Sequence, residues 1–176
     1  MDRQALAAAI KEAAYLEGDF LLRSGKRSNY YIDKYRFETQ PHILAELGQR
    51  FAEHVAESTT LIAGAELGGV ALAAATSLAC HRPFIIVRNA RKDYGTGNLF
   101  EGVLNKGDRV LIVEDVATTG GQVLEAAKAI VESGAHVEKI VAVIDRLQGA
   151  RENIESAGFK FDALFTSTDL GIETPD

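Results

Sequence analysis

Apolar residues recur along this chain at two different spacings, which distinguish predicted helices from predicted strands. Where they recur every three or four positions, one face of a helix is apolar and packs on a core. Asp2 is placed to cap the first helix, which Gly18 is expected to end, and Pro41 suits the first turn of the second. This pattern predicts helices over residues 2–17, 41–55, 70–79, 122–132 and 150–157.

Compact runs of Val, Ile and Leu predict strands that are buried on both faces. Such runs occupy residues 61–64, 84–87, 110–113 and 139–144, and the alternating segment 159–165 predicts an edge strand. Because strands and helices alternate from Leu61 to Ile144, we expect an α/β fold with a mainly parallel central sheet and helices on both faces. The tail beyond Leu170 is expected to fray.

The segment from Phe20 to Asp33 stands outside this alternation. It predicts two short strands on either side of a polar, glycine-containing turn, and it is dense in Arg, Lys and Tyr. We expect residues 18–36 to form a small hood over a site at the edge of the sheet. A solvated hairpin with charges at its tip is the alternative that these residues leave open.

Composition narrows the class of protein. The 176 residues, 47% hydrophobic and 25% charged, suit a single domain over residues 1–176. The net charge of −6 gives no basic footprint, so neither nucleic acid nor a membrane surface is an expected partner. Cys80 is the one cysteine, which favours a reducing, cytoplasmic setting. No apolar run reaches transmembrane length.

The stretch from Val110 to Gln122 carries the densest candidate chemistry. Its apolar run ends in the acidic pair Glu114 and Asp115, which places two carboxylates at the C-terminal end of a strand. The segment Thr118-Thr119-Gly120-Gly121 follows, directly before a predicted helix. Hydroxyls and open backbone N–H groups at a helix N-terminus favour phosphate. An ordinary turn between strand and helix remains the alternative.

Other loops follow the remaining strand ends. Gly68 and Gly69 either let the backbone approach a phosphate or permit tight packing of helix on sheet. The polar loop over residues 88–102, called the lid below, places three cations within five residues, which suits a pyrophosphate clamp, although a plain surface loop is possible. Arg146 follows the strand that ends at Ile144. Ligands bind at this edge of such sheets, so the loops should converge.

Two of these segments resemble a known family. The stretch Val110–Gln122 resembles the phosphoribosyl pyrophosphate (PRPP) motif of the type I phosphoribosyltransferases, which has four apolar residues, an acidic pair and a Thr-rich loop ending in glycine. The segment from Phe20 resembles the orotate phosphoribosyltransferase signature Phe-x-Leu-x-Ser-Gly-x-x-Ser-x-Tyr. With the lid between them in the family's order, the likeness extends from Phe20 to Leu170.

The resemblance implies a reaction and its partners. It implies a pentosyltransferase, a glycosyltransferase that moves ribose 5-phosphate from PRPP to orotate and forms orotidine 5′-monophosphate and pyrophosphate, in pyrimidine biosynthesis. Mg²⁺ would be the cofactor, held mainly through the pyrophosphate of PRPP, with no protein metal ligand assigned. The resemblance also implies a homodimer in which the lid reaches into the neighbouring subunit's site.

Roles for individual residues follow from the same resemblance. Glu114, Asp115 and Lys92 would be catalytic. The residues implied to bind PRPP are Gly68, Gly69, Arg88, Lys92, Tyr94, Glu114, Asp115, Val116, Ala117, Thr118, Thr119, Gly120, Gly121 and Gln122. Those implied to bind orotate are Arg23, Tyr31, Thr118 and Arg146.

Two lid positions depart from the family's usual Arg-Lys-x-x-Lys-x-His-Gly. Asn89 falls where a lysine is usual, so no role is carried over to it, and Tyr94 falls where a histidine is usual. Two alternatives stay open. One is a phosphoribosyltransferase of another base, although the hood and Arg146 offer cations that suit a carboxylate. The other is a PRPP-sensing regulator without catalysis.

Overall fold

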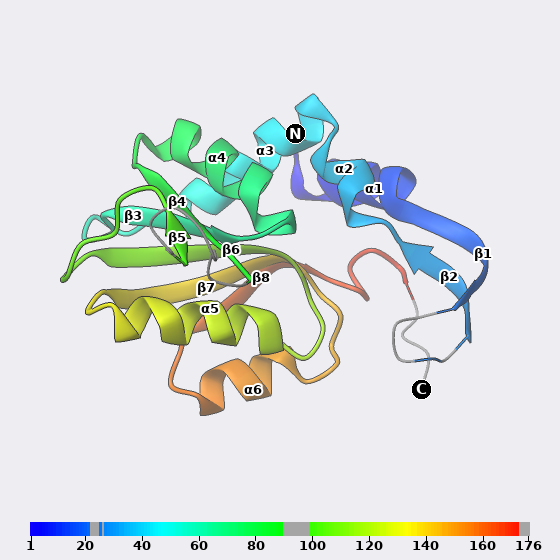
Figure 1. The fold of residues 1–176 in the computed structure, drawn as a ribbon. Coiled ribbons are helices and arrows are strands. Elements are labelled where there is room, and N and C mark those ends of the chain that lie inside the picture. Colours follow the sequence, from blue (N-terminus) through cyan, green and yellow to red (C-terminus); the bar gives the residue numbers. More distant parts are fainter. Residues whose placement is uncertain (22–24, 26, 90–98, 173–176) are drawn as a thin grey trace.

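The structure, a computed structural model, describes residues 1–21, 25, 27–89 and 99–172. Its main sheet has the strand order β5-β4-β3-β6-β7-β8 (Figure 1), and all neighbouring pairs are parallel except β4 with β5. The strands of this sheet are β3 Leu61–Ala65, β4 Phe84–Val87, β5 Phe100–Glu101, β6 Arg109–Ala117, β7 His136–Asp145 and β8 Phe161–Thr166. The predicted α/β fold with a mainly parallel sheet is confirmed.

Helices cover both faces of this sheet, as predicted (Figure 1). The α3 and α4 helices lie on one face and α5 and α6 on the other, with α1 and α2 beside α3. The helices are α1 Arg3–Ala14, α2 Lys34–Glu38, α3 Pro41–Ala52, α4 Gly68–Cys80, α5 Gly121–Glu132 and α6 Ala150–Ser156. None of the described helices is long and apolar enough to cross a bilayer.

Alternation along the strands divides the core into two layers. Successive side chains of a strand point to opposite faces, so Leu111 and Val113 pack with α1, α3 and α4, whereas Val110 and Ile112 pack with α5 and α6. All four side chains are at most 1% exposed. The runs of Val, Ile and Leu are therefore strands buried on both faces, which explains why their sequence shows no polar alternation.

The N-terminal hairpin forms a separate two-stranded sheet, with β1 Tyr15–Leu21 antiparallel to β2 Arg27–Ile32. It projects from one end of the molecule (Figure 1). Asp2 caps α1 as predicted, accepting from the backbone N–H of Ala5 at 2.7 Å. The predicted end of this helix is wrong: it ends at Ala14, because Tyr15 already pairs with Ile32, and Gly18 lies within β1.

Three further differences from the expected elements reflect tertiary contacts. The single-turn α2 was not predicted, because five residues are too few to show a period, yet its Phe37 is fully buried. The strand β5 lies inside the expected loop and pairs with the end of β4. The chain stays packed as far as Ile172, the last described residue, which is 5% exposed and whose N–H donates to the carbonyl of Ser167.

Candidate active site

Loops from four strand ends meet at the carboxyl edge of the sheet. The backbone N–H of Glu66, after β3, donates to the carbonyl of Val87 at the end of β4. The backbone N–H of Arg146, after β7, donates to the carbonyl of Ala117 at the end of β6. Parallel strands bring their carboxyl ends to one edge, where ligands of such sheets bind. The described loops therefore lie together as the sequence predicts.

The segment after β6 forms an open hollow of about 200 Å³ at the N-terminus of α5. Gly120 adopts a left-handed conformation (φ +76°), and a Cβ there would come within 3.0 Å of the Ile154 side chain. The side-chain amide of Asn153 in α6 fixes the loop by donating a hydrogen bond of 2.9 Å to the carbonyl of Thr119. The hollow is lined by Glu114 and by residues 116–123. First-turn N–H groups of a helix lack intrahelical acceptors, so this hollow can bind an anion.

The two carboxylates of the acidic pair lie in different surroundings. Glu114 lines the hollow, whereas Asp115 is absent from its lining and is 2% exposed. One Asp115 oxygen accepts from the backbone N–H of Val116, and the other lies 2.5 Å from Nζ of Lys34, at the start of α2. Asp115 is thus paired with a cation, Lys34, that the sequence did not indicate.

Glu114 is 8% exposed, and its Oε2 atom has no hydrogen-bond partner among the described residues. Burial, and next the charge of Asp115, raise its pKa to about 8. Glu38 of α2 is 3% exposed, and burial followed by the charge of Asp115 likewise raises its pKa to about 8. The buried acids and Lys34 therefore form one electrostatic group.

The glycine pair at the start of α4 is explained by packing. A Cβ on Gly69 would lie 2.9 Å from Cα of Gly64 in β3, so its absence lets helix and strand approach each other. A Cβ on Gly68 would lie 1.4 Å from an oxygen of Asp115, so this position must be glycine while Asp115 keeps its conformation. Contact of either glycine with a phosphate stays a prediction.

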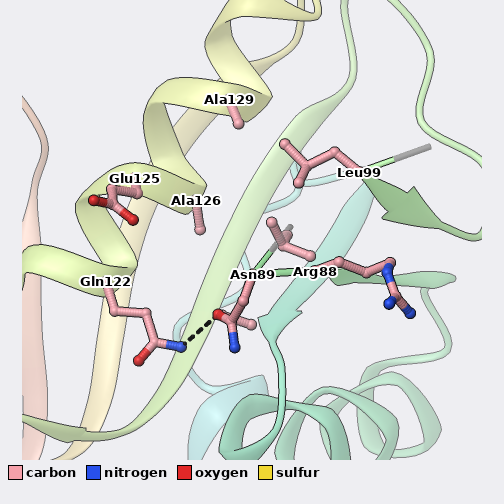
Figure 2. A pocket seen from close by; sticks show the side chains of 9 residues that line it. Arg88, Asn89, Leu99, Gln122, Glu125, Ala126 and Ala129 are labelled. Carbon is pink, nitrogen blue, oxygen red and sulfur yellow. Dashed lines mark hydrogen bonds between the residues drawn. The ribbon is translucent and has the colours of Figure 1, made fainter. Parts of the chain in front are cut away.

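The first residues of the lid connect three loops. Arg88 is half-buried and lies between Glu66 at 3.8 Å and Glu101 at 3.6 Å, and its backbone N–H donates to the carbonyl of Leu99. Asn89 donates its backbone N–H to Oε1 of Glu66 and accepts from Nε2 of Gln122, both at 2.9 Å. Figure 2 shows the contact between Asn89 and Gln122 beside a pocket of about 210 Å³.

The hairpin meets the sheet at Arg146. Nη2 of Arg146 lies 3.3 Å from the hydroxyl of Tyr30, whose ring stacks on Tyr15 with centroids 5.6 Å apart. Tyr31 points to the other face of β2, packs on Phe20 and is 45% exposed. Tyr30 is therefore the tyrosine that contacts Arg146, and a role for Tyr31 at the base stays a prediction.

Three predicted residues, Arg23, Lys92 and Tyr94, lie outside the described part of the chain. Other residues of the site were missed by sequence reasoning: Tyr30, Lys34, Glu38 and Glu66. A signal existed for Lys34 and Glu38, because their spacing of four places both on one face of a helix. The element was too short for that spacing to be recognised.

A model of the phosphoribosyl transferase domain matches residues 36–166, well over half of the chain. The chain therefore belongs to the phosphoribosyltransferase family. The strand end, acidic pair and anion hollow described above all lie within the matched residues.

Similarity to individual proteins narrows the family further. The chain is 45% identical to the orotate phosphoribosyltransferase of Methanocaldococcus jannaschii over 172 residues, covering 97% of this chain and 98% of that one. It is 48% identical to that of Pyrococcus horikoshii over 92% of this chain and 88% of that one. Within the phosphoribosyltransferases, the chain belongs to the orotate phosphoribosyltransferases.

A solved structure supports the same family assignment. The orotate phosphoribosyltransferase of Mycobacterium tuberculosis in complex with PRPP has a TM-score of 0.84 at 31% identity, covering 98% of this chain and 100% of that one. The adenine phosphoribosyltransferase of Leishmania donovani, at 20% identity and a TM-score of 0.73, shares the fold. That likeness extends to the fold alone.

Proposed function

We propose that this chain transfers ribose 5-phosphate from PRPP to a ring nitrogen of orotate, forming orotidine 5′-monophosphate and pyrophosphate. One observation carries the proposal. The domain match begins at residue 36, after the hairpin, whereas the similarity to the M. jannaschii enzyme covers 97% of the chain and so includes it. Tyr30 of the hairpin contacts the side chain of Arg146, the candidate partner of orotate's carboxylate.

The acidic pair and the lid would stabilise opposite charges. When the bond from the anomeric carbon to pyrophosphate breaks, the ribose gains oxocarbenium character and the leaving group gains negative charge. Glu114 and Asp115 would hold the ribose hydroxyls and favour the cationic ring. Arg88 and Lys92, with Tyr94 nearby in the lid, would neutralise the pyrophosphate.

The 5-phosphate would bind in the hollow before α5. Backbone N–H groups over residues 118–122 and the hydroxyls of Thr118 and Thr119 would be its donors, and the helix dipole favours the anion. Gly68 and Gly69 would border the pyrophosphate. Two observations support the 5-phosphate site: Gly120 has a left-handed conformation, and residues 116–123 line an open hollow.

Orotate would be recognised by its carboxylate and its planar ring. Arg146 has a forked set of donors that suits a carboxylate, and its Nε atom is buried without a hydrogen-bond partner among the described residues. Thr118, at the junction of the two substrates, would reach the base. Arg23 and Tyr31 would complete the base pocket from the hood, residues 18–36.

Mg²⁺ would enter with PRPP. Within the described ranges, no cluster of three His, Cys, Asp or Glu side chains is arranged to hold a metal ion. The ion would be held mainly by the pyrophosphate oxygens of PRPP. When bound, the ion would neutralise the phosphate charges and assist departure of pyrophosphate. Arg88 would supply the neighbouring positive charge from the protein.

The active form is proposed to be a homodimer in the cytoplasm, with the lid acting across the subunit boundary. Mixing Lys92→Ala and Asp115→Asn proteins tests the exchange of lids. If each lid serves the partner's site, mixed dimers regain a site with both groups intact and recover activity. A mixture as inactive as its parents would contradict this arrangement.

Incubating the protein with PRPP, Mg²⁺ and orotate tests the function. We expect loss of orotate absorbance with formation of one pyrophosphate per orotate consumed. Stable orotate absorbance together with consumption of adenine or hypoxanthine would show a phosphoribosyltransferase of another base. Binding of PRPP with no turnover of any base would show the regulator instead.

A further inference from the structure

Lys34, Glu38, Glu114 and Asp115 form a buried cluster of three carboxyl groups and one cation. The three carboxyl residues are at most 8% exposed. Lys34 and Glu38 come from α2, and the other two from the end of β6. Lys34 reaches into the cluster from the rim, with its Nζ 2.5 Å from an oxygen of Asp115 and its side chain 34% exposed. The cluster adjoins the anion hollow, because Glu114 belongs to the cluster and also lines the hollow.

Asp115 is held on both sides. One oxygen accepts from the backbone N–H of Val116 and the other contacts Lys34. Gly68 leaves the space for this arrangement, because a Cβ there would lie 1.4 Å from the Asp115 oxygen and 3.1 Å from Nζ of Lys34. The start of α4 is therefore shaped around the ion pair, and only a residue without a side chain fits beside it.

The other two carboxyl groups lack such support. Oε1 of Glu38 and Oε2 of Glu114 are buried without hydrogen-bond partners in the described structure. An unpaired buried carboxylate is unfavourable, so proton uptake is favoured at both. The charge of Asp115 raises the pKa of each group, and Lys34 lowers it. Two flanking residues make smaller contributions: Asp33 raises the pKa of Glu38, and Tyr35 raises the pKa of Lys34.

We propose that Lys34 is a positioning residue: its ammonium orients the carboxylate of Asp115 and limits proton uptake by the neighbouring Glu114, while Glu38 opposes it. This inference rests on the proposed function, in which the acidic pair faces the ribose of PRPP. An ionised pair stabilises the cationic ribose, whereas a protonated pair does not. Lys34 and Glu38 thus control how much negative charge the reaction meets, without touching the reacting atoms.

A merely structural ion pair between α2 and the sheet makes a different prediction. Removing it would lower the amount of folded protein but leave the protonation of the surviving active sites unchanged. The pH dependence of kcat/KM for PRPP separates these possibilities, because its acidic limb reports ionisation of the free enzyme. The ionisation of PRPP itself is common to all variants, so differences between them belong to the protein.

The experiment compares this profile for the parent, Lys34→Met, Lys34→Arg and Glu38→Gln. We expect Lys34→Met to move the acidic limb upward by about one pH unit, which lowers kcat/KM about tenfold at a pH below the limb. Lys34→Arg should leave the acidic limb where it lies in the parent protein, since arginine keeps the positive charge. Glu38→Gln should move the limb downward, because it removes a negative neighbour of Glu114. Lys128→Met, an exposed site on α5, is the matched control.

Coincident acidic limbs for Lys34→Met and the parent would overturn the proposal, as would a Lys34→Arg profile that matches Lys34→Met. If Lys34→Met does not fold, the opposite shift in Glu38→Gln and an unshifted Lys34→Arg remain as the deciding results. An absence of turnover with orotate in the parent would instead overturn the proposed function, so the two failures are distinguishable.

Discussion

Asn89 departs from the family pattern, and hydrogen bonds to neighbouring segments accommodate it. In place of the usual lysine it supplies no charge, but its side chain accepts from Gln122 and its backbone N–H donates to Glu66. Gln122 also donates to the carbonyl of Glu66. The loop after β3, the start of the lid and the start of α5 are therefore joined at Asn89. Figure 2 shows the contact between Asn89 and Gln122.

Replacing Asn89 by alanine should loosen this junction. The change removes one hydrogen bond, worth about 1 kcal/mol, which corresponds to about a fivefold rise in KM for PRPP. We expect kcat to change less, because Asn89 carries no charge for the transition state. Steady-state kinetics at varied PRPP measure both constants, with Asn105→Ala at an exposed position as control. An unchanged KM would mean that the junction does not position the PRPP loop.

Residue-level reasoning from sequence succeeded where one continuous string carried the chemistry. The run from Glu114 to Gln122 forms a hollow at the start of α5, as its residues predict. It failed for Lys34, because its contact with Asp115 joins residues far apart in sequence. The choice between Tyr30 and Tyr31 also required the structure, since it depends on which face of β2 meets Arg146.

The α2 helix shows how a short element is fixed by its tertiary contacts. It has only five residues, but it packs a fully buried Phe37 and brings Lys34 and Glu38 against the end of β6. Long elements were predictable, because α3 repeats the helical period over three turns and β7 contains a continuous apolar run. Short ones such as α2 and β5 form because of tertiary contacts, so their sequences show no period.

The packing of α2 also predicts how stability depends on pH. Glu38 and Glu114 have folded-state pKa values raised to about 8, so the folded protein binds more protons than the unfolded chain. The stabilisation is fully present below the unfolded pKa of 4.5 and is lost as the pH rises through about 8. The free energy of unfolding should therefore fall between pH 7 and 8.5.

Urea unfolding across this interval measures the effect. The fall is expected to be on the order of 1 kcal/mol per pH unit, and Glu38→Gln should reduce the slope. Glu132→Gln, an exposed site at the end of α5, serves as control. The pKa of His54 is lowered, chiefly by burial, so its effect is confined to lower pH. Stability that is constant or rises with pH would contradict the raised pKa values.

At the scale of the whole molecule, the fold brings two kinds of segment together. The parallel sheet supplies the acidic pair and the anion hollow, while the hairpin, which lies outside the alternating pattern, supplies Tyr30 next to Arg146. The fold class was predictable because the alternation of strands and helices permits few topologies. A hood at the edge of the sheet was also expected, but the contact of Tyr30 with Arg146 was not, because no local pattern encodes it.

The proposed recognition of orotate's carboxylate by Arg146 is the most specific claim about this arrangement. The measurement that tests it is the ratio of kcat/KM for orotate to that for uracil, which lacks the carboxylate, in the parent and in Arg146→Gln. A charged hydrogen bond contributes about 1.5–3 kcal/mol, so we expect the ratio to fall at least tenfold in Arg146→Gln while KM for PRPP is retained. An unchanged ratio, or equal losses for both bases, would contradict recognition of orotate by Arg146.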